Sequence, residues 1–285
     1  MLSASSLGLL VLDPSGRGAL QLTGSGGVTD NTGSIVVDSN NAAAAIITGS
    51  GGVTAANIDV TGGTLVTGTG KFSTPVNHEP PTPDPVGLPL PPAPSQTFAA
   101  VNYSGSTPLT LSPGTYTGGI KITGTGSVTL ESGVYYMKGG GFSLTGQGSI
   151  SGSGVLLVNA PSTPSDTISL TGAGKMTLTP SDNLTGAYAA YDGIAILQDP
   201  ASTAPIDIVG SGGLTIAGTI YAPKAALNIV GSGGMLINPD AATGRAEAIV
   251  FDVSDTGSGS LVLNSGSGQS SQPPTIAAPA NVTVN

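Results

Sequence analysis

The chain has 285 residues, of which 45 are Gly and 22 are Pro, and 38% are hydrophobic while only 8% are charged. A disordered chain would be richer in charge and poorer in Val, Ile and Leu, so this composition predicts a folded protein. The 7 basic and 16 acidic residues give a net charge of −9, which argues against nucleic acid as a partner. The absence of Cys excludes disulfides, thiolate metal ligands and thiol nucleophiles.

The first predicted element is the apolar segment LGLLVLDP, which begins at Leu7. It is too short to span a bilayer and lacks the basic residues and the small-residue cleavage site of a signal peptide. We therefore predict a β-strand here and expect no direct membrane insertion by this chain.

One short phrase then recurs along almost the whole chain. Its copies are LTGSGGVT at Leu22, ITGSGGVT at Ile47, ITGTGSVT at Ile122, LTGQGSIS at Leu144, LTGAGKMT at Leu170, IVGSGGLT at Ile208 and IVGSGGML at Ile229, with looser copies around Gly68 and Gly257. The first glycines fall at 24, 49, 68, 124, 146, 172, 210, 231 and 257, so most gaps are 19 to 26 residues. Such an irregular period is typical of stacked coils, in which insertions are confined to loops.

Within each copy, large and very small residues alternate on one face. Leu22, Gly24, Gly26 and Val28 point one way, and glycine lets the chain take positive φ and turn a corner. Apolar runs beginning at residues 154, 193, 218 and 246 predict further strands, and no stretch has helical periodicity. The predicted fold is therefore all-β: a single-stranded right-handed parallel β-helix (β-solenoid) over residues 1–268. It would have about ten coils and be on the order of 50 Å long.

Residues 73–97 interrupt the repeats with prolines at 75, 80, 81, 83, 85, 89, 91, 92 and 94. This density forbids ladder pairing and favours an extended, polyproline-like strap. The strap is interpreted either as a crossover packed along the rod or as a docking strip for a partner.

The last segment, residues 269–285, changes character again. A Ser-, Gly- and Gln-rich linker leads into PPTIAAPANVTVN, which resembles the opening strand of an immunoglobulin-like or cadherin-like surface repeat. We expect a further domain of that kind to follow.

Catalytic chemistry has little support in the sequence. His78 is the only histidine and lies in the strap, so neither a Ser-His-Asp triad nor a multi-histidine metal site is expected. Asp192, Asp199 and Asp207 are the closest carboxylates, but each stands at a turn or a strand start, where Asp is common. No Asp-rich calcium loop occurs. We predict no catalytic, cofactor-binding or metal site, and hence no enzyme.

A threonine recurs at one outward position of the repeats, at Thr23, Thr48, Thr123, Thr145 and Thr171. Stacked threonines would form a flat hydroxyl ladder of the kind that ice-binding solenoids present, or simply satisfy one another across coils. Val209 and Val230 interrupt the ladder, so ice binding is a minor alternative.

The segment LTLSPGTYTGGIKITGTGSVTLESGVYYMKGGGFSLTGQGSISGSGVLLVN, residues 109–159, resembles the C-terminal glycine-rich β-helical region of Tad (Flp-type) pilus-assembly TadE/TadG-like proteins. So do YDGIAILQDP at Tyr191 and LTIAGTIYAPKAALNIVGSGG at Leu214. The resemblance implies an exported, extracellular or envelope-located bacterial β-solenoid associated with pili, and it supplies no catalytic residue.

These observations predict a structural or adhesive module: a rigid spacer whose faces contact protein or surface-glycan partners. Two alternatives remain. A β-helix that assembles end to end into filaments would expose apolar, uncapped terminal coils. A β-helical carbohydrate-active enzyme would gather carboxylates in a groove.

Overall fold

The computed structural model describes residues 6–266, which form 26 β-strands and one 3-10 helix. Every strand pairing among these residues is parallel, which confirms the predicted all-β class with parallel strands and is compatible with a β-solenoid. The apolar segment near the N-terminus is a strand, β1 (Leu7–Val11), as predicted. No helix in this part of the chain is long and apolar enough to cross a membrane.

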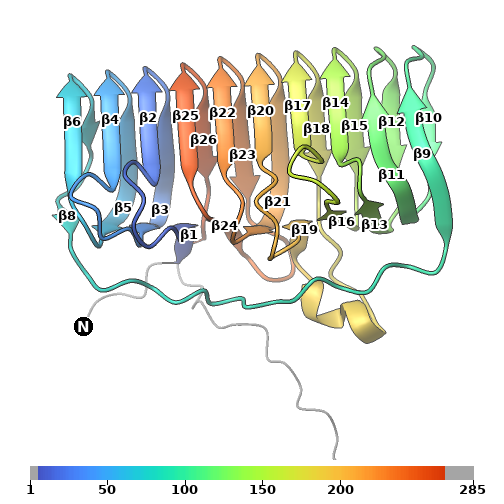
Figure 1. The fold of residues 1–285 in the computed structure, drawn as a ribbon, viewed down its shortest axis with the longest axis horizontal. Helices are drawn as coiled ribbons and strands as arrows, with labels where there is room; N and C mark the ends of the chain where they lie inside the picture. Colours follow the sequence, from blue (N-terminus) through green and yellow to red (C-terminus); the bar gives the residue numbers. More distant parts are fainter. Residues whose placement is uncertain (1–5, 267–285) are drawn as a thin grey trace, which may run out of the picture.

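The strands form three rows that run along the length of the molecule (Figure 1). We call them the front, second and third rows, and one strand segment from each makes a rung. The front row contains, in spatial order, β6 (Thr64–Gly68), β4 (Ala45–Gly49), β2 (Leu20–Gly24), β25 (Val253–Gly257), β22 (Leu227–Gly231), β20 (Ile206–Gly210), β17 (Ile168–Gly172), β14 (Phe142–Gly146) and the C-terminal parts of β11 (Gly114–Ile122) and β9 (Thr97–Tyr103).

The second row contains, in the same order, β7 (Lys71–Phe72), the first parts of β5 (Gly52–Val60) and β3 (Gly27–Val37), β26 (Ser260–Leu263), β23 (Gly234–Asn238), the first part of β21 (Gly213–Ala222), β18 (Lys175–Leu178), β15 (Ser149–Gly152), β12 (Ser127–Leu130) and β10 (Leu109–Leu111). The third row contains β8 (Val76–Asn77), the last parts of β5 and β3, β1, β24 (Ala246–Val250), the last part of β21, β19 (Ile194–Gln198), β16 (Val155–Ala160), β13 (Gly133–Lys138) and the first parts of β11 and β9.

The spatial order of the rungs differs from their order in the sequence. The first rung, made of β1, β2 and β3, pairs on one side with the second rung and on the other with the last one, made of β24, β25 and β26. We call this contact between the first and last rungs the seam. Two runs of rungs, β1–β8 and β9–β26, thus meet at the seam instead of forming one uninterrupted sequential stack.

The interior is filled by aliphatic side chains that repeat from rung to rung. Leu22 faces Ile47 in the neighbouring strand, and both are essentially inaccessible to solvent. Glycines let the chain turn at the end of the front row: Gly49 has φ +114°, and a Cβ there would lie 2.4 Å from the Gly24 carbonyl oxygen. The first glycine of the other copies also has positive φ, except Gly124. The predicted role of glycine at the corner is therefore confirmed at all the other copies.

The strap spans the molecule from one end to the other (Figure 1). Residues 78–96 contain no strand, although the predicted region 73–97 also includes β8 and the first residue of β9. Leu88 is buried against a second apolar cluster on the outer side of the third row, together with Tyr191 from the 3-10 helix η1 (Gly186–Tyr191). The interpretation as a packed crossover is the one that the structure supports.

The predicted linker and surface repeat, residues 269–285, lie outside the described residues.

Candidate functional site

A groove that contains two acidic residues lies where the chain leaves the second row after β18 and β23. Its volume is about 670 Å³, and its lining is mostly Ser, Thr, Gly and Pro, together with Asp182 and Asp240. No Lys, Arg or His is among the residues that line it. The groove is therefore polar and acidic, without a cation to bind an anionic sugar.

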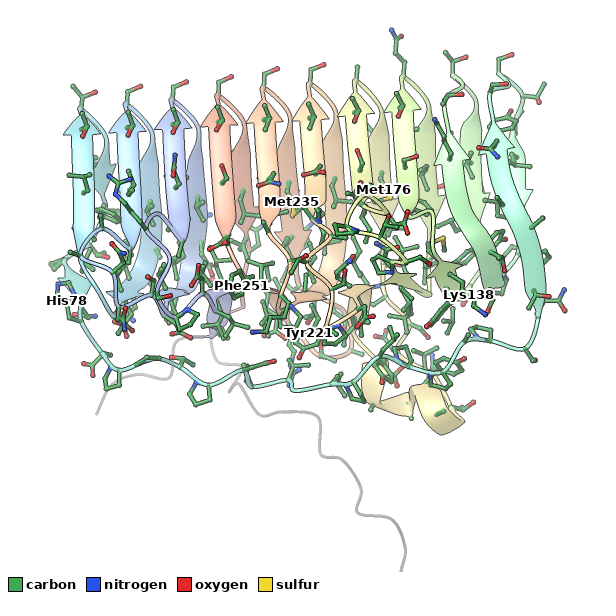
Figure 2. The ribbon with its side chains drawn as sticks, in the orientation of Figure 1. His78, Lys138, Met176, Tyr221, Met235 and Phe251 are labelled. Carbon is green, nitrogen blue, oxygen red and sulfur yellow. The ribbon has the colours of Figure 1, made fainter. Side chains whose placement is uncertain are left out.

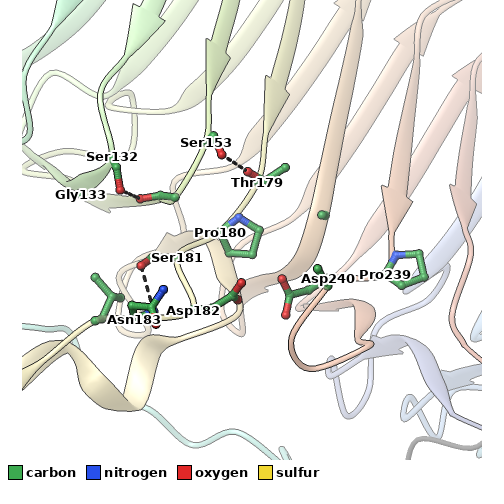
Figure 3. A pocket seen from close by; sticks show the side chains of 14 residues that line it. Ser132, Gly133, Ser153, Thr179, Pro180, Ser181, Asp182, Asn183, Pro239 and Asp240 are labelled. Atoms are coloured by element: carbon green, nitrogen blue, oxygen red, sulfur yellow. Dashed lines mark hydrogen bonds between the residues drawn. The ribbon is translucent and has the colours of Figure 1, made fainter.

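Asp182 and Asp240 point toward each other across this groove (Figure 3). Burial, the Asp240 charge and a hydrogen bond with Asp240 raise the pKa of the Asp182 carboxyl, and the Asp192 charge adds to the shift. Asp240 is held in place, because its Oδ2 accepts hydrogen bonds of 2.8 Å from both the Thr243 amide and the Thr243 hydroxyl. Two facing carboxyl groups, of which Asp182 has a raised pKa, are the minimum needed for acid–base work.

The three carboxylates singled out from the sequence do not come together. Asp192 and Asp199 flank opposite ends of the extended strand β19, so about 20 Å of chain separates them. Asp192 accepts a 2.8 Å hydrogen bond from the Leu184 amide, on the other side of η1, and Asp199 accepts one of 2.9 Å from the Ala201 amide within a turn. Asp207 lies on β20 in the front row and accepts a 2.8 Å bond from Asn228.

Sequence reasoning missed Asp182 and Asp240, which lie 58 positions apart at unremarkable turns. Their proximity arises because β18 and β23 both pair with β21, one on each side. Only the strand register, and no motif, brings them to one groove.

His78 is exposed at the end of the molecule where the strap begins (Figure 2). Its Nδ1 donates a 2.9 Å hydrogen bond to the Val60 carbonyl. Within residues 6–266, no group of three or more His, Cys, Asp or Glu side chains is placed to hold a metal ion.

The front row carries the outward threonine ladder along one side of the molecule. The register aligns, in spatial order, Thr67, Thr48, Thr23, Thr256, Val230, Val209, Thr171 and Thr145. Thr67 and Thr256 belong to the two looser copies of the repeat and extend the row, while Thr123 follows the end of β11. The two valines sit in the middle and divide the hydroxyl row into two parts.

Comparisons with models of known protein families, with curated proteins and with solved structures found no match to this chain.

Proposed function

We propose that this chain is a non-catalytic structural module, built as a right-handed single-stranded parallel β-helix. It acts as a rigid spacer or adhesive surface in a bacterial cell-surface or extracellular protein. The location, and an association with pilus components, rest on the resemblance of residues 109–159 to Tad pilus-assembly proteins. Protein or surface-glycan partners would contact the long faces of the rod.

The observation that carries the rigid-rod proposal is the way in which the strap binds one rung after another. Near its start, the Thr61 hydroxyl donates to the Glu79 carbonyl at 3.0 Å. The Thr82 amide then donates to Asp38 at 2.8 Å. Each bond contributes on the order of 1 kcal/mol, and together they tie successive points of the strap to neighbouring rungs.

Further along, three tyrosines anchor the strap to the other run of rungs. The hydroxyls of Tyr221, Tyr191 and Tyr188 donate to Asp84, Pro89 and Pro92 at 2.6, 2.9 and 2.8 Å. Figure 2 shows Tyr221 above the strap, near the middle of the molecule. Because the strap spans the seam, it holds both runs of rungs in one line.

Double electron–electron resonance tests this rigidity directly, since the chain has no Cys of its own. Thr48→Cys and Thr145→Cys place spin labels six rungs apart on the exposed face of the front row. At about 4.8 Å per rung we expect one narrow distance distribution near 29 Å. The labelled chain is diluted in an excess of unlabelled chain, so that only distances within one molecule are measured. A broad or bimodal distribution under these conditions would reject the rigid spacer.

A matched pair, Thr48→Cys with Thr256→Cys, tests the order of the rungs through dipolar broadening of the continuous-wave spectrum, which reports shorter distances. These positions are two rungs apart in space, at about 10 Å, although more than 200 residues separate them in sequence. A long distance for this pair would mean that the seam is not closed in solution.

A second candidate function is favoured by the Asp182–Asp240 pair: a carbohydrate-active enzyme that uses the groove. Asp182→Asn and Asp240→Asn would then each abolish the release of reducing ends from a polysaccharide panel. Asp207→Asn, on the front face, is the matched control. Absence of such activity in the unaltered chain leaves the structural module as the function.

A further inference from the structure

The core of the molecule is closed along its length and open at its two ends. Among residues 6–266, six hydrophobic side chains pack against the main core while remaining only partly buried. All six lie on the two end rungs: Phe72, Val76, Phe98, Val101, Tyr103 and Leu109. Val66, on the end strand β6, is 41% exposed, although the side chains at the equivalent position of the inner rungs are buried. Each end thus presents apolar surface that a further rung would cover.

The end strands also leave their backbone edges open. The register of the front row ends at β6 on one side and at β9 on the other (Figure 1). Natural proteins usually protect such edges with charged residues, proline or bulges, because an open edge pairs with another chain. Neither β6 (TLVTG) nor β9 (TFAAVNY) contains a charged residue or a proline.

The two ends are complementary in register. The front-row pairings, followed from rung to rung, show that Val66 at one end and Tyr103 at the other hold equivalent inward-facing positions. In the second row, Phe72 and Leu109 are equivalent in the same way. A second copy translated along the rod would place each of these side chains opposite its equivalent, as every inner rung does.

We propose that the β6 end of one copy pairs with the β9 end of a second copy, so that this chain assembles head to tail into filaments. The inference rests on the proposed rod and names its partner as the chain itself. A head-to-tail contact keeps all strands parallel and extends the lines of buried apolar side chains into the second copy. It joins two different surfaces, so further copies can add without closing a ring. A contact between two β6 ends would make the paired strands antiparallel, so equivalent apolar side chains would no longer lie opposite one another.

The test uses the full chain, with one blocked end per variant. Val66→Lys puts a charge on the β6 end, and Val101→Lys puts one on the β9 end, where Val101 is equivalent to Thr64. Val230→Lys is the matched control, because Val230 is 39% exposed on an inner rung of the same row of strands. Circular dichroism and thermal melting establish that each variant is folded.

Sedimentation velocity and negative-stain electron microscopy then give distinct results. We expect the unaltered chain and V230K to form filaments of constant width whose mass rises with concentration. V66K and V101K should each stay monomeric, while their equimolar mixture forms dimers and nothing longer. The mixture forms a dimer only if the free β9 end of V66K pairs with the free β6 end of V101K.

Three results would overturn the proposal: discrete single rods of the unaltered chain at every concentration, dimers of either variant alone, or no dimer in the mixture. If V101K is poorly folded, Ala99→Lys, at an exposed position of the same end strand, replaces it. Single rods with the narrow 29 Å distance proposed above would reject the assembly and keep the rigid module, so the two failures are distinguishable.

Discussion

Asp255 stands directly opposite Leu22 in the ladder that joins β25 to β2 across the seam. On its other side it faces Ile229, so a carboxylate occupies one place in an otherwise hydrophobic line of inward-facing side chains. Asp255 is 1% exposed, and within the described part of the chain neither of its carboxylate oxygens has a hydrogen-bond partner of normal geometry. The seam therefore places an ionisable side chain, the Asp255 carboxyl, inside the hydrophobic core.

Other acids gather at the same contact. The Asp30 carboxylate is buried beside the Ser265 hydroxyl, which donates to it at 2.6 Å, and burial raises the pKa of Asp30. Burial, the Asp13 charge and a hydrogen bond with Asp13 raise the pKa of Asp252 to about 6. Burial raises the pKa of Asp255 to about 6 as well, and the Gly27 amide limits the rise.

These shifts predict that the protein is more stable in acid than at neutral pH. Asp252 and Asp255 have pKa values of about 6 in the folded state against an ordinary value of 3.8, so the folded state binds more protons between these pH values. Each group then contributes up to about 3 kcal/mol to the free energy of unfolding below about pH 4, and this contribution is lost as the pH rises through 6. Urea unfolding between pH 4 and 7.5 measures this, and a free energy of unfolding that rises with pH contradicts it.

Asp255→Asn should stabilise the protein at pH 8 by about 1–2 kcal/mol, because the substitution removes a buried charge while keeping the side-chain volume. At pH 4 the carboxyl is protonated, so the two proteins should differ little. Unfolding curves at both values check this, with Asp207→Asn on the front face as the control. An equal effect of D255N at both pH values would show that the charge is not responsible.

Tyr221→Phe should lower the free energy of unfolding by about 1–2 kcal/mol, because it leaves the Asp84 carboxylate without the 2.6 Å bond that the hydroxyl donates. Burial raises the pKa of Tyr221, so the hydroxyl keeps its proton at neutral pH. Tyr188→Phe removes a bond at a more exposed position and should cost less. Hydrogen exchange in residues 78–96 should accelerate only in Y221F; unchanged protection there would mean that other contacts hold the strap.

Gly49→Ala should destabilise the protein by about 3 kcal/mol or prevent folding, since its Cβ would lie 2.4 Å from the Gly24 carbonyl oxygen at a φ of +114°. Gly186→Ala is the matched control. Its φ is +60°, nothing lies within 4 Å of the added Cβ, and we expect a cost of about 1 kcal/mol. Equal thermal shifts for the two variants would show that backbone strain, and not the close approach between rungs, dominates.

Much of the local structure could be predicted from residue patterns. Alternation of apolar and small residues placed the strands, as at Leu22 and Val28, and glycine marked the corner at Gly49. The proline-rich region predicted an extended strap, because proline excludes ladder pairing wherever the chain folds.

The candidate site and the stacking order could not be predicted in this way. Asp182 and Asp240 follow strands that only the register brings to either side of β21. Asp255 holds the place of Leu22 in its copy of the repeat, but only the register shows that this place lies at the seam. A carboxylate's partners depend on which rung lies beside it, and the repeated phrase is the same in most rungs.

The sequence by itself determined the strand period, the corners and the crossover, because these follow from the steric preferences of single residues and their neighbours. Only the tertiary structure decided that the first rung packs against the last, that two open ends remain and that acids line the seam. Near-identical repeats pair almost equally well with one another, so their spatial order is set by the length and contacts of the strap and by the burial of the whole stack.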